Sequence, residues 1–120
     1  MRQISLLSLF LSCASVGFSQ TSLATITGTI ADPSGAAIAG ATVEVHNLEN
    51  GAVFKAASSD TGNYTVQQLP IGDYAIDVTV PGFKKYSHTN FHLAAGQTMR
   101  EDVALQVGNA TESVTVQAEA

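Results

Sequence analysis

The chain has 120 residues, of which 45% are hydrophobic and 12% charged, with ten Gly, no Trp and a formal net charge of −5 at pH 7. This length suits one domain of ordinary size, and this balance is typical of a packed domain, which excludes a disordered tail. The acidic excess argues against a nucleic-acid partner, because phosphate binding needs clustered Lys and Arg, and the only cluster here is the pair Lys84-Lys85.

Residues 1–19 have the pattern of a secretory signal peptide. Arg2 precedes an apolar run over residues 4–11, and a small-x-small cleavage site ends at Ser19. The run is too short to span a bilayer. A lipoprotein signal that uses Cys13 is the alternative, although the residues before this cysteine match the usual pattern poorly. Cleavage after Ser19 would leave a mature chain with no cysteine, and so with no disulfide and no thiolate metal site.

From Ala24 onward, short runs with a period of two alternate with turn signals about every ten residues, and no stretch keeps a helical period. This pattern predicts an all-β fold, a seven-stranded antiparallel β-sandwich. The residues expected to face its core are Ile26, Gly28 and Ile30 in the first strand, Ala41, Val43 and Val45 in the second, Tyr74, Ile76, Val78 and Val80 in the fifth, Phe91 and Leu93 in the sixth, and Met99, Val103, Leu105 and Val107 in the seventh.

The remaining strands carry weaker signals. The run 53–58 is weakly patterned and the run 63–66 is short, so both are predicted to be edge or hairpin strands. The polar stretch 86–90 is expected to precede the sixth strand. Glu101 falls on the apolar face of the seventh strand, and we expect its carboxylate to reach water at the rim of the sandwich, because an unpaired buried charge is costly.

Several stretches in the right order resemble the carboxypeptidase regulatory-like domain. They are residues 28–43 (GTIADPSGAAIAGATV), 59–66 (SDTGNYTV), 69–74 (LPIGDY) and 80–83 (VPGF). The resemblance covers about Ala24 to Val107, so residues 20–108 are taken as one domain. It implies a prealbumin-like sandwich, often grouped with carbohydrate-binding-like folds, that accompanies an enzyme or a receptor and has no catalytic residues of its own.

The end of the chain resembles the TonB box of outer-membrane TonB-dependent receptors. The residues that carry this resemblance are Glu112, Ser113, Val114, Thr115, Val116, Gln117 and Ala118. Many such receptors have the same order of signal peptide, regulatory-like domain and box, followed by a plug and a barrel. Residues 109–120 are therefore expected to be an extended tail that pairs with the sheet of a TonB-like periplasmic partner. The alternative is an eighth strand of the chain's own sandwich, or a frayed tail; docking predicts an unpaired tail and the alternative predicts a paired one.

Candidate metal and catalytic groups have simpler explanations in the sequence. The candidates for zinc are His46, His88 and His92, and those for calcium are Asp60, Asn63 and Asp73. On a strand, a four-residue gap separates two histidines by about 13 Å, too far to share an ion, so exposed polar histidines are expected. Turn chemistry explains Asp60 and Asn63 without an ion. No nucleophile with a nearby base is found, so we predict no metal, no cofactor and no enzyme activity.

The sequence thus predicts a binding or docking module on the periplasmic face of the outer membrane, as the N-terminal accessory domain of a TonB-dependent receptor or a fragment of one. Its partner would be a TonB-like domain, or the plug and barrel of the full receptor. A carbohydrate-binding module of a secreted or surface protein is the alternative, and a structural spacer is a third. Carbohydrate binding predicts at least two aromatic side chains side by side on an exposed face. The aromatic residues considered are Tyr64, Tyr74, Phe83, Tyr86 and Phe91.

Overall fold

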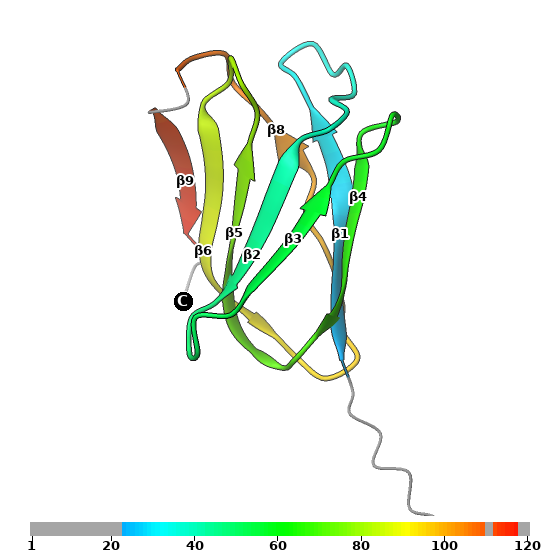
Figure 1. Cartoon of the computed structure of the whole chain (residues 1–120), viewed down its shortest axis with the longest axis vertical. Helices are drawn as coiled ribbons and strands as arrows, with labels where there is room; N and C mark the ends of the chain where they lie inside the picture. Colours follow the sequence, from blue (N-terminus) through cyan, green and yellow to red (C-terminus); the bar gives the residue numbers. More distant parts are fainter. Residues whose placement is uncertain (1–22, 110–111, 118–120) are drawn as a thin grey trace, which may run out of the picture.

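A computed structural model describes residues 23–109 and 112–117 as two packed β-sheets (Figure 1). The strands are β1 (Ala24–Ala31), β2 (Thr42–Asn47), β3 (Val53–Ala57), β4 (Asn63–Leu69), β5 (Gly72–Thr79), β6 (Lys85–Leu93), β7 (Thr98–Arg100), β8 (Val103–Ala104) and β9 (Ser113–Gln117). Within these ranges, no helix is long and apolar enough to cross a membrane. The predicted signal peptide, residues 1–19, lies outside the described residues.

The two sheets have different strand orders. The four-stranded sheet has the order β4-β1-β7, with β8 also paired to β1, and the five-stranded sheet has the order β3-β2-β5-β6-β9. The predicted all-β sandwich is confirmed. The structure differs from the expected pattern in strand count and direction: nine strands are described, and β7, β8 and β9 each run parallel to their partner.

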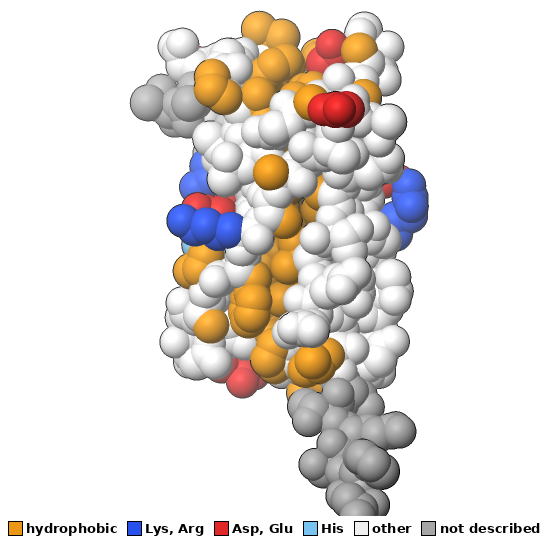
Figure 2. Space-filling model, turned by 45° about the vertical axis from the view of Figure 1, so that its right-hand side comes forward, with side chains coloured by type: hydrophobic (Ala, Val, Ile, Leu, Met, Phe, Trp, Pro, Cys, Tyr) orange, Lys and Arg blue, Asp and Glu red, His pale blue; other side chains and the backbone are white. Residues whose placement is uncertain are grey.

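The core lies between the sheets and is built from most of the alternating apolar positions; the expectation for Val107 is wrong, because this side chain is 70% exposed. Ile26, Val43, Tyr74 and Ile76 are among the side chains with no exposed surface. Burial of each such side chain contributes about 1.5–3 kcal/mol. The partly buried Phe54 of β3 packs against this core, and hydrophobic side chains form a vertical band on the side of the molecule seen in Figure 2.

Gly28 of β1 lets this strand approach the backbone at Glu101 closely. A Cβ atom at this position would meet the carbonyl oxygen of Glu101 at 1.8 Å, so only glycine fits there. The Glu101 amide donates to the Thr27 carbonyl at 2.9 Å. Next to it, the Asp102 carboxylate accepts from the Thr29 amide at 3.0 Å. The Asp102 side chain therefore binds the Thr29 amide of β1, where a backbone carbonyl would bind it in a continuous pair of strands. This interruption divides the expected seventh strand into β7 and β8.

The structure agrees with the predicted edge strands but not with the predicted start of the sixth strand. β3 pairs only with β2, and β4 pairs only with β1, as expected of edge strands. The polar stretch 86–90 was expected to precede the sixth strand, and this is wrong, because it lies inside β6. There Thr89 and Asn90 oppose the single residue Ala75 of β5, and Asn90 has a φ of 62°, which marks a β-bulge.

Candidate functional site

A row of polar residues crosses the outer face of the five-stranded sheet. The register pairs Lys55 with Glu44, Glu44 with Asp77, Asp77 with Ser87, and Ser87 with Thr115. Directly paired residues project to the same face of a sheet. One row thus contains a residue from each of β3, β2, β5, β6 and β9.

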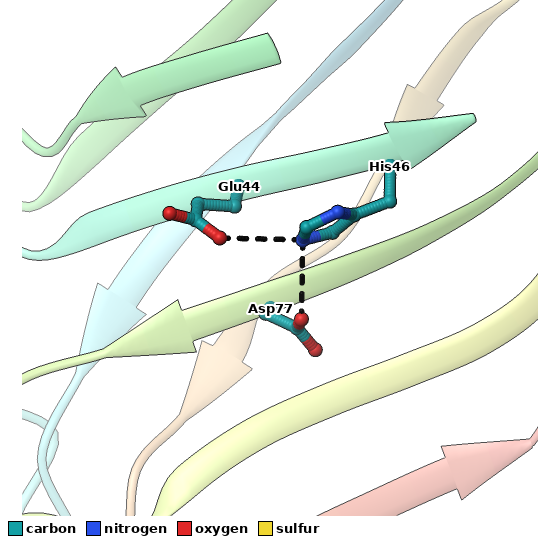
Figure 3. A group of neighbouring side chains, drawn as sticks. All are labelled: Glu44, His46 and Asp77. Atoms are coloured by element: carbon teal, nitrogen blue, oxygen red, sulfur yellow. Dashed lines mark ion pairs between the residues drawn. The ribbon is translucent and has the colours of Figure 1, made fainter. Parts of the chain in front are cut away.

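His46 joins this row from the next position on the same face of β2 (Figure 3). Its Nε2 atom lies 3.3 Å from Glu44 Oε2 and 3.3 Å from Asp77 Oδ2. The residue opposite His46 on β5 is Ala75, whose small side chain leaves room for the imidazole. Each ligand atom of the three polar residues lies within 4.8 Å of the others. We call Glu44, His46 and Asp77 the outer-face triad.

A serine and two lysines also contact the carboxylates of the triad. Ser87 Oγ donates to Asp77 Oδ1 at 2.6 Å. Lys55 Nζ lies 3.6 Å from Glu44 Oε1, and Lys85 Nζ lies 3.6 Å from Asp77 Oδ2. His46 Nε2, in contrast, is buried and makes no hydrogen bond. Glu44 Oε2 and Asp77 Oδ2 thus both lie at ion-pair distance from a nitrogen atom that hydrogen-bonds to neither of them.

The sequence did not predict this triad, and the expectation of exposed polar histidines is wrong for two of the three. The side chain of His46 is 32% exposed and that of His88 is 15% exposed, whereas that of His92 is 66% exposed. Glu44 and His46 share one face of a strand by simple alternation, which is a signal in the sequence. Asp77 joins them only through the β2–β5 register, which no local pattern reveals.

The structure does not gather the residues considered for calcium on one strand or in one sheet. Asp73 lies in β5 of the five-stranded sheet, where its Oδ1 atom is 2.9 Å from His92 Nδ1. Asn63 begins β4 in the other sheet, and its amide donates to the Thr61 hydroxyl. Asp60 lies in the turn before β4.

A second polar cluster connects the two sheets on the inner side. Tyr86 Oη donates to Glu101 Oε1 at 2.6 Å, and His88 Nδ1 lies 3.1 Å from Glu101 Oε2. Tyr64 Oη donates to the Glu101 backbone carbonyl at 2.6 Å. We call Tyr64, Tyr86, His88 and Glu101 the inter-sheet cluster. The side chain of Glu101 is only 14% exposed, so the expectation that its carboxylate reaches water at the rim is wrong. It is stabilised by two side-chain partners instead.

The two tyrosines of this cluster have perturbed acidity. Burial raises the pKa of Tyr64, and the negative charge of Glu101 raises it further. Burial also raises the pKa of Tyr86, followed by the hydrogen bond to Glu101. Both phenols therefore stay protonated, and both act as hydrogen-bond donors toward Glu101.

Most of the segment that resembles a TonB box lies in β9. Ser113–Gln117 pairs in parallel with β6, from Lys85↔Ser113 to Thr89↔Gln117. This is the arrangement expected of a strand of the chain's own sheet and not of an unpaired tail. Ala118 lies outside the described residues, so partner binding by residues 112–118 stays a prediction.

No aromatic side chain is exposed in the described part of the chain. Tyr64, Tyr74 and Phe91 are buried, and Phe83 and Tyr86 are partly buried against the core. The stacking platform that carbohydrate binding was expected to need is therefore missing from residues 23–109 and 112–117.

Comparison with known proteins agrees with this architecture. The model of the carboxypeptidase regulatory-like domain family matches residues 25–106. No curated protein matches the sequence. The TIE protein of Bacillus anthracis is a similar solved structure, with 19% identity and a TM-score of 0.57, over 72% of this chain and 17% of that one.

Two further solved structures share the fold. A cohesin–X-dockerin complex of Acetivibrio cellulolyticus matches with 18% identity and a TM-score of 0.59, over 71% of this chain and 58% of that one. A putative carbohydrate-binding protein of Bacteroides uniformis matches with 17% identity and a TM-score of 0.54, over 68% of this chain and 40% of that one. This chain thus corresponds to only a part of each of these proteins, and the likeness shows the fold alone.

Proposed function

Because this chain belongs to the carboxypeptidase regulatory-like domain family, we propose that it is a non-catalytic docking module. It would serve as the N-terminal accessory domain of a TonB-dependent outer-membrane receptor, or as a fragment of one, on the periplasmic face of that membrane. The free tail that docking was expected to require is not found for Ser113–Gln117, because these residues pair with β6. The observation that carries the proposal is instead that β9 is an edge strand, which follows the matched domain (Figure 1). An edge strand presents unpaired backbone groups on which another strand can add.

The direction of the hydrogen bonds indicates which residues would receive the partner. The Lys85 amide donates to the Glu112 carbonyl at 2.9 Å. Backbone groups of successive residues in a strand point to opposite sides, so those of Glu112, Val114 and Val116 face β6. The amides and carbonyls of Ser113 and Thr115 face away from it. Among the described residues, no strand lies beyond this edge.

The composition of β9 suits a strand that recruits a partner. Ser113, Thr115 and Val116 are exposed, so these side chains remain available for contact with a partner strand. Alternating hydroxyl and valine side chains give the edge high β-propensity without a large hydrophobic patch. Backbone hydrogen bonds would then supply affinity, and the alternate side chains would supply selectivity.

Carbohydrate binding remains the alternative from another class of function. The similar fold of a putative carbohydrate-binding protein supports it only by analogy, and a fold does not determine function. Without exposed aromatic side chains in the described residues, the geometry favours a protein partner.

The test measures binding of the chain from Gln20 onward to the periplasmic C-terminal domain of TonB by titration calorimetry. Thr115→Pro removes an outward-facing amide and leaves the bonds to β6 in place, a position where an edge strand tolerates proline. We expect it to weaken binding by about tenfold or more, because paired backbone donors are lost. Thr115→Val is the matched control, since it keeps the amide and the β-branched shape, and we expect its affinity to stay within about threefold of the parent.

A chain that lacks residues 110–120 should not bind at all. If the folded parent chain shows no binding, the receptor proposal is wrong and screening against glycans becomes the next experiment. Equal binding by the Thr115→Pro variant and the parent would exclude β9 as the docking strand.

A further inference from the structure

We propose that the outer-face triad of Glu44, His46 and Asp77 binds a divalent transition-metal ion of the Zn²⁺ type. This inference does not depend on the docking function proposed above. The triad contributes one imidazole nitrogen and two carboxylate oxygens, which lie within 4.8 Å of one another on the outer face of the five-stranded sheet, with both carboxylates turned toward the imidazole (Figure 3).

The spacing of the ligand atoms matches a metal better than a hydrogen-bonded pair. His46 Nε2 lies 3.3 Å from an oxygen of Glu44 and 3.3 Å from an oxygen of Asp77. Ligands bound at the usual Zn–N and Zn–O lengths of about 2.0–2.2 Å in tetrahedral geometry are about 3.4 Å apart. The two carboxylate oxygens are within 4.8 Å of each other, and a small rotation of the longer Glu44 side chain would bring them to the same spacing.

The imidazole nitrogen of the triad also lacks a hydrogen bond. His46 Nε2 is buried and has no hydrogen-bond partner, which is costly for a polar atom. In the neutral ring, an unprotonated Nε2 would direct its lone pair at two carboxylates; in the protonated ring, its single proton could serve only one of them. One metal ion would satisfy the nitrogen and both oxygens together.

The surroundings hold the triad in place and leave it accessible. Ser87 donates to the Asp77 oxygen that does not face His46, a second interaction of the kind that orients metal-binding carboxylates. Lys85 is the competing cation at Asp77, but its Nζ atom is 3.6 Å away and its side chain is 41% exposed, so it can move aside. The side chains of the triad are 20% to 33% exposed, and water can therefore complete the coordination.

The donor set selects the kind of ion. Ca²⁺ and Mg²⁺ prefer oxygen ligands alone, and Mg²⁺ demands near-octahedral geometry. One imidazole with two carboxylates suits Zn²⁺ and its first-row neighbours. We therefore expect Zn²⁺ to bind and Ca²⁺ not to compete with it.

The experiment titrates Zn²⁺ into the chain from Gln20 onward, which contains every described residue and no cysteine, prepared without a histidine tag. Calorimetry should give one ion per chain. His46→Gln and Asp77→Asn should each weaken binding by about tenfold or more, since each removes one of three ligands. His92→Gln is the matched control: it removes a histidine that also contacts a carboxylate, Asp73 Oδ1, at 2.9 Å, but outside the triad. Its affinity should remain that of the parent.

A spectroscopic readout keeps the test valid if a variant is less stable. On addition of Zn²⁺ to the parent, the ring nitrogen signals of His46 should shift to those of a metal-bound Nε2, while those of His92 should not change. The proposal is wrong if the parent takes up no ion, if His92→Gln lowers the affinity as much as His46→Gln, or if Ca²⁺ displaces Zn²⁺ at equal concentration.

Discussion

Tyr64 shows how one side chain contributes to stability through its protonation state. It is 2% exposed, and its hydroxyl donates to the Glu101 carbonyl at 2.6 Å. Burial raises the pKa of this phenol above its ordinary value. The folded chain therefore keeps a proton that the unfolded chain releases once the pH exceeds about 10.

This difference predicts a loss of stability in alkali. Below about pH 10 Tyr64 is protonated in both states, so it gives the free energy of unfolding no dependence on pH; above it, the free energy falls by up to about 1.4 kcal/mol per pH unit. Tyr64→Phe should cost about 1 kcal/mol at pH 7 for the lost hydrogen bond, and should reduce the decline above pH 10. Urea unfolding at pH 7 and pH 11 measures both effects. Parallel declines in the parent and the variant would contradict the prediction.

The sequence correctly predicts the burial of residues whose surroundings depend mainly on the alternation of their neighbours in the chain. Alternation alone places Ile26, Val43 and Ile76 in the core, and the structure confirms all three. Glu101 and His46 were misplaced because their surroundings come from distant strands. Glu101 contacts β6 across the core, and His46 meets Asp77 only through strand register.

At the scale of elements, β9 differs from the other strands of its sheet. Within residues 23–109 and 112–117 it pairs only with β6, and its Ser113, Thr115 and Val116 are exposed. β5, in contrast, pairs on both sides and contains the fully buried Tyr74 and Ile76. Stability should therefore be lowest at this edge of the sandwich.

Removal of residues 110–120 should leave the sandwich folded, at a cost of about 1–2 kcal/mol, because few buried contacts are lost. The midpoint of urea unfolding measures the cost. In the parent chain, the amides of Val114 and Val116 should exchange with solvent much faster than the amide of Ile76. A truncated chain that no longer folds would show that β9 is part of the core structure, and it could not then be a readily available docking strand.

β6 explains why element boundaries were harder to predict than element type. Its residues 86–90 are polar, so no hydrophobic alternation marks them as a strand. They are held by pairing on both sides, with β5 and with β9. Pairing with neighbouring strands thus outweighs a weak local pattern. The bulge at Asn90 also shifts which alternate residues face the core, and the sequence pattern does not reveal this shift.

At the scale of the whole molecule, the two sheets are joined by polar contacts as well as by the apolar core. Glu101 follows β7 of the four-stranded sheet, whereas Tyr86 and His88 belong to β6 of the five-stranded sheet. Both carboxylate oxygens of Glu101 are used, at 2.6 Å to Tyr86 Oη and 3.1 Å to His88 Nδ1. We expect these contacts to restrict how one sheet lies on the other more strictly than apolar packing alone would.

The energy of this link can be measured with a double-mutant cycle. Glu101→Ala should cost about 3 kcal/mol, because it leaves the Tyr86 hydroxyl and the His88 ring without partners. Tyr86→Phe alone should cost about 1–2 kcal/mol. The double variant should lose less than the sum, with a coupling energy of about 1 kcal/mol or more, because the two changes remove the same hydrogen bond.

Lys84 and Glu112 provide the matched control for this cycle. Their Nζ and Oε2 atoms are 3.4 Å apart, and their side chains are 32% and 53% exposed. An exposed pair of this kind should show a coupling of at most about 0.5 kcal/mol, and salt should reduce it further. If the Glu101–Tyr86 coupling is as small as that of the surface pair, then apolar packing alone sets the arrangement of the two sheets. A larger coupling that persists in high salt would assign that role to the inter-sheet cluster.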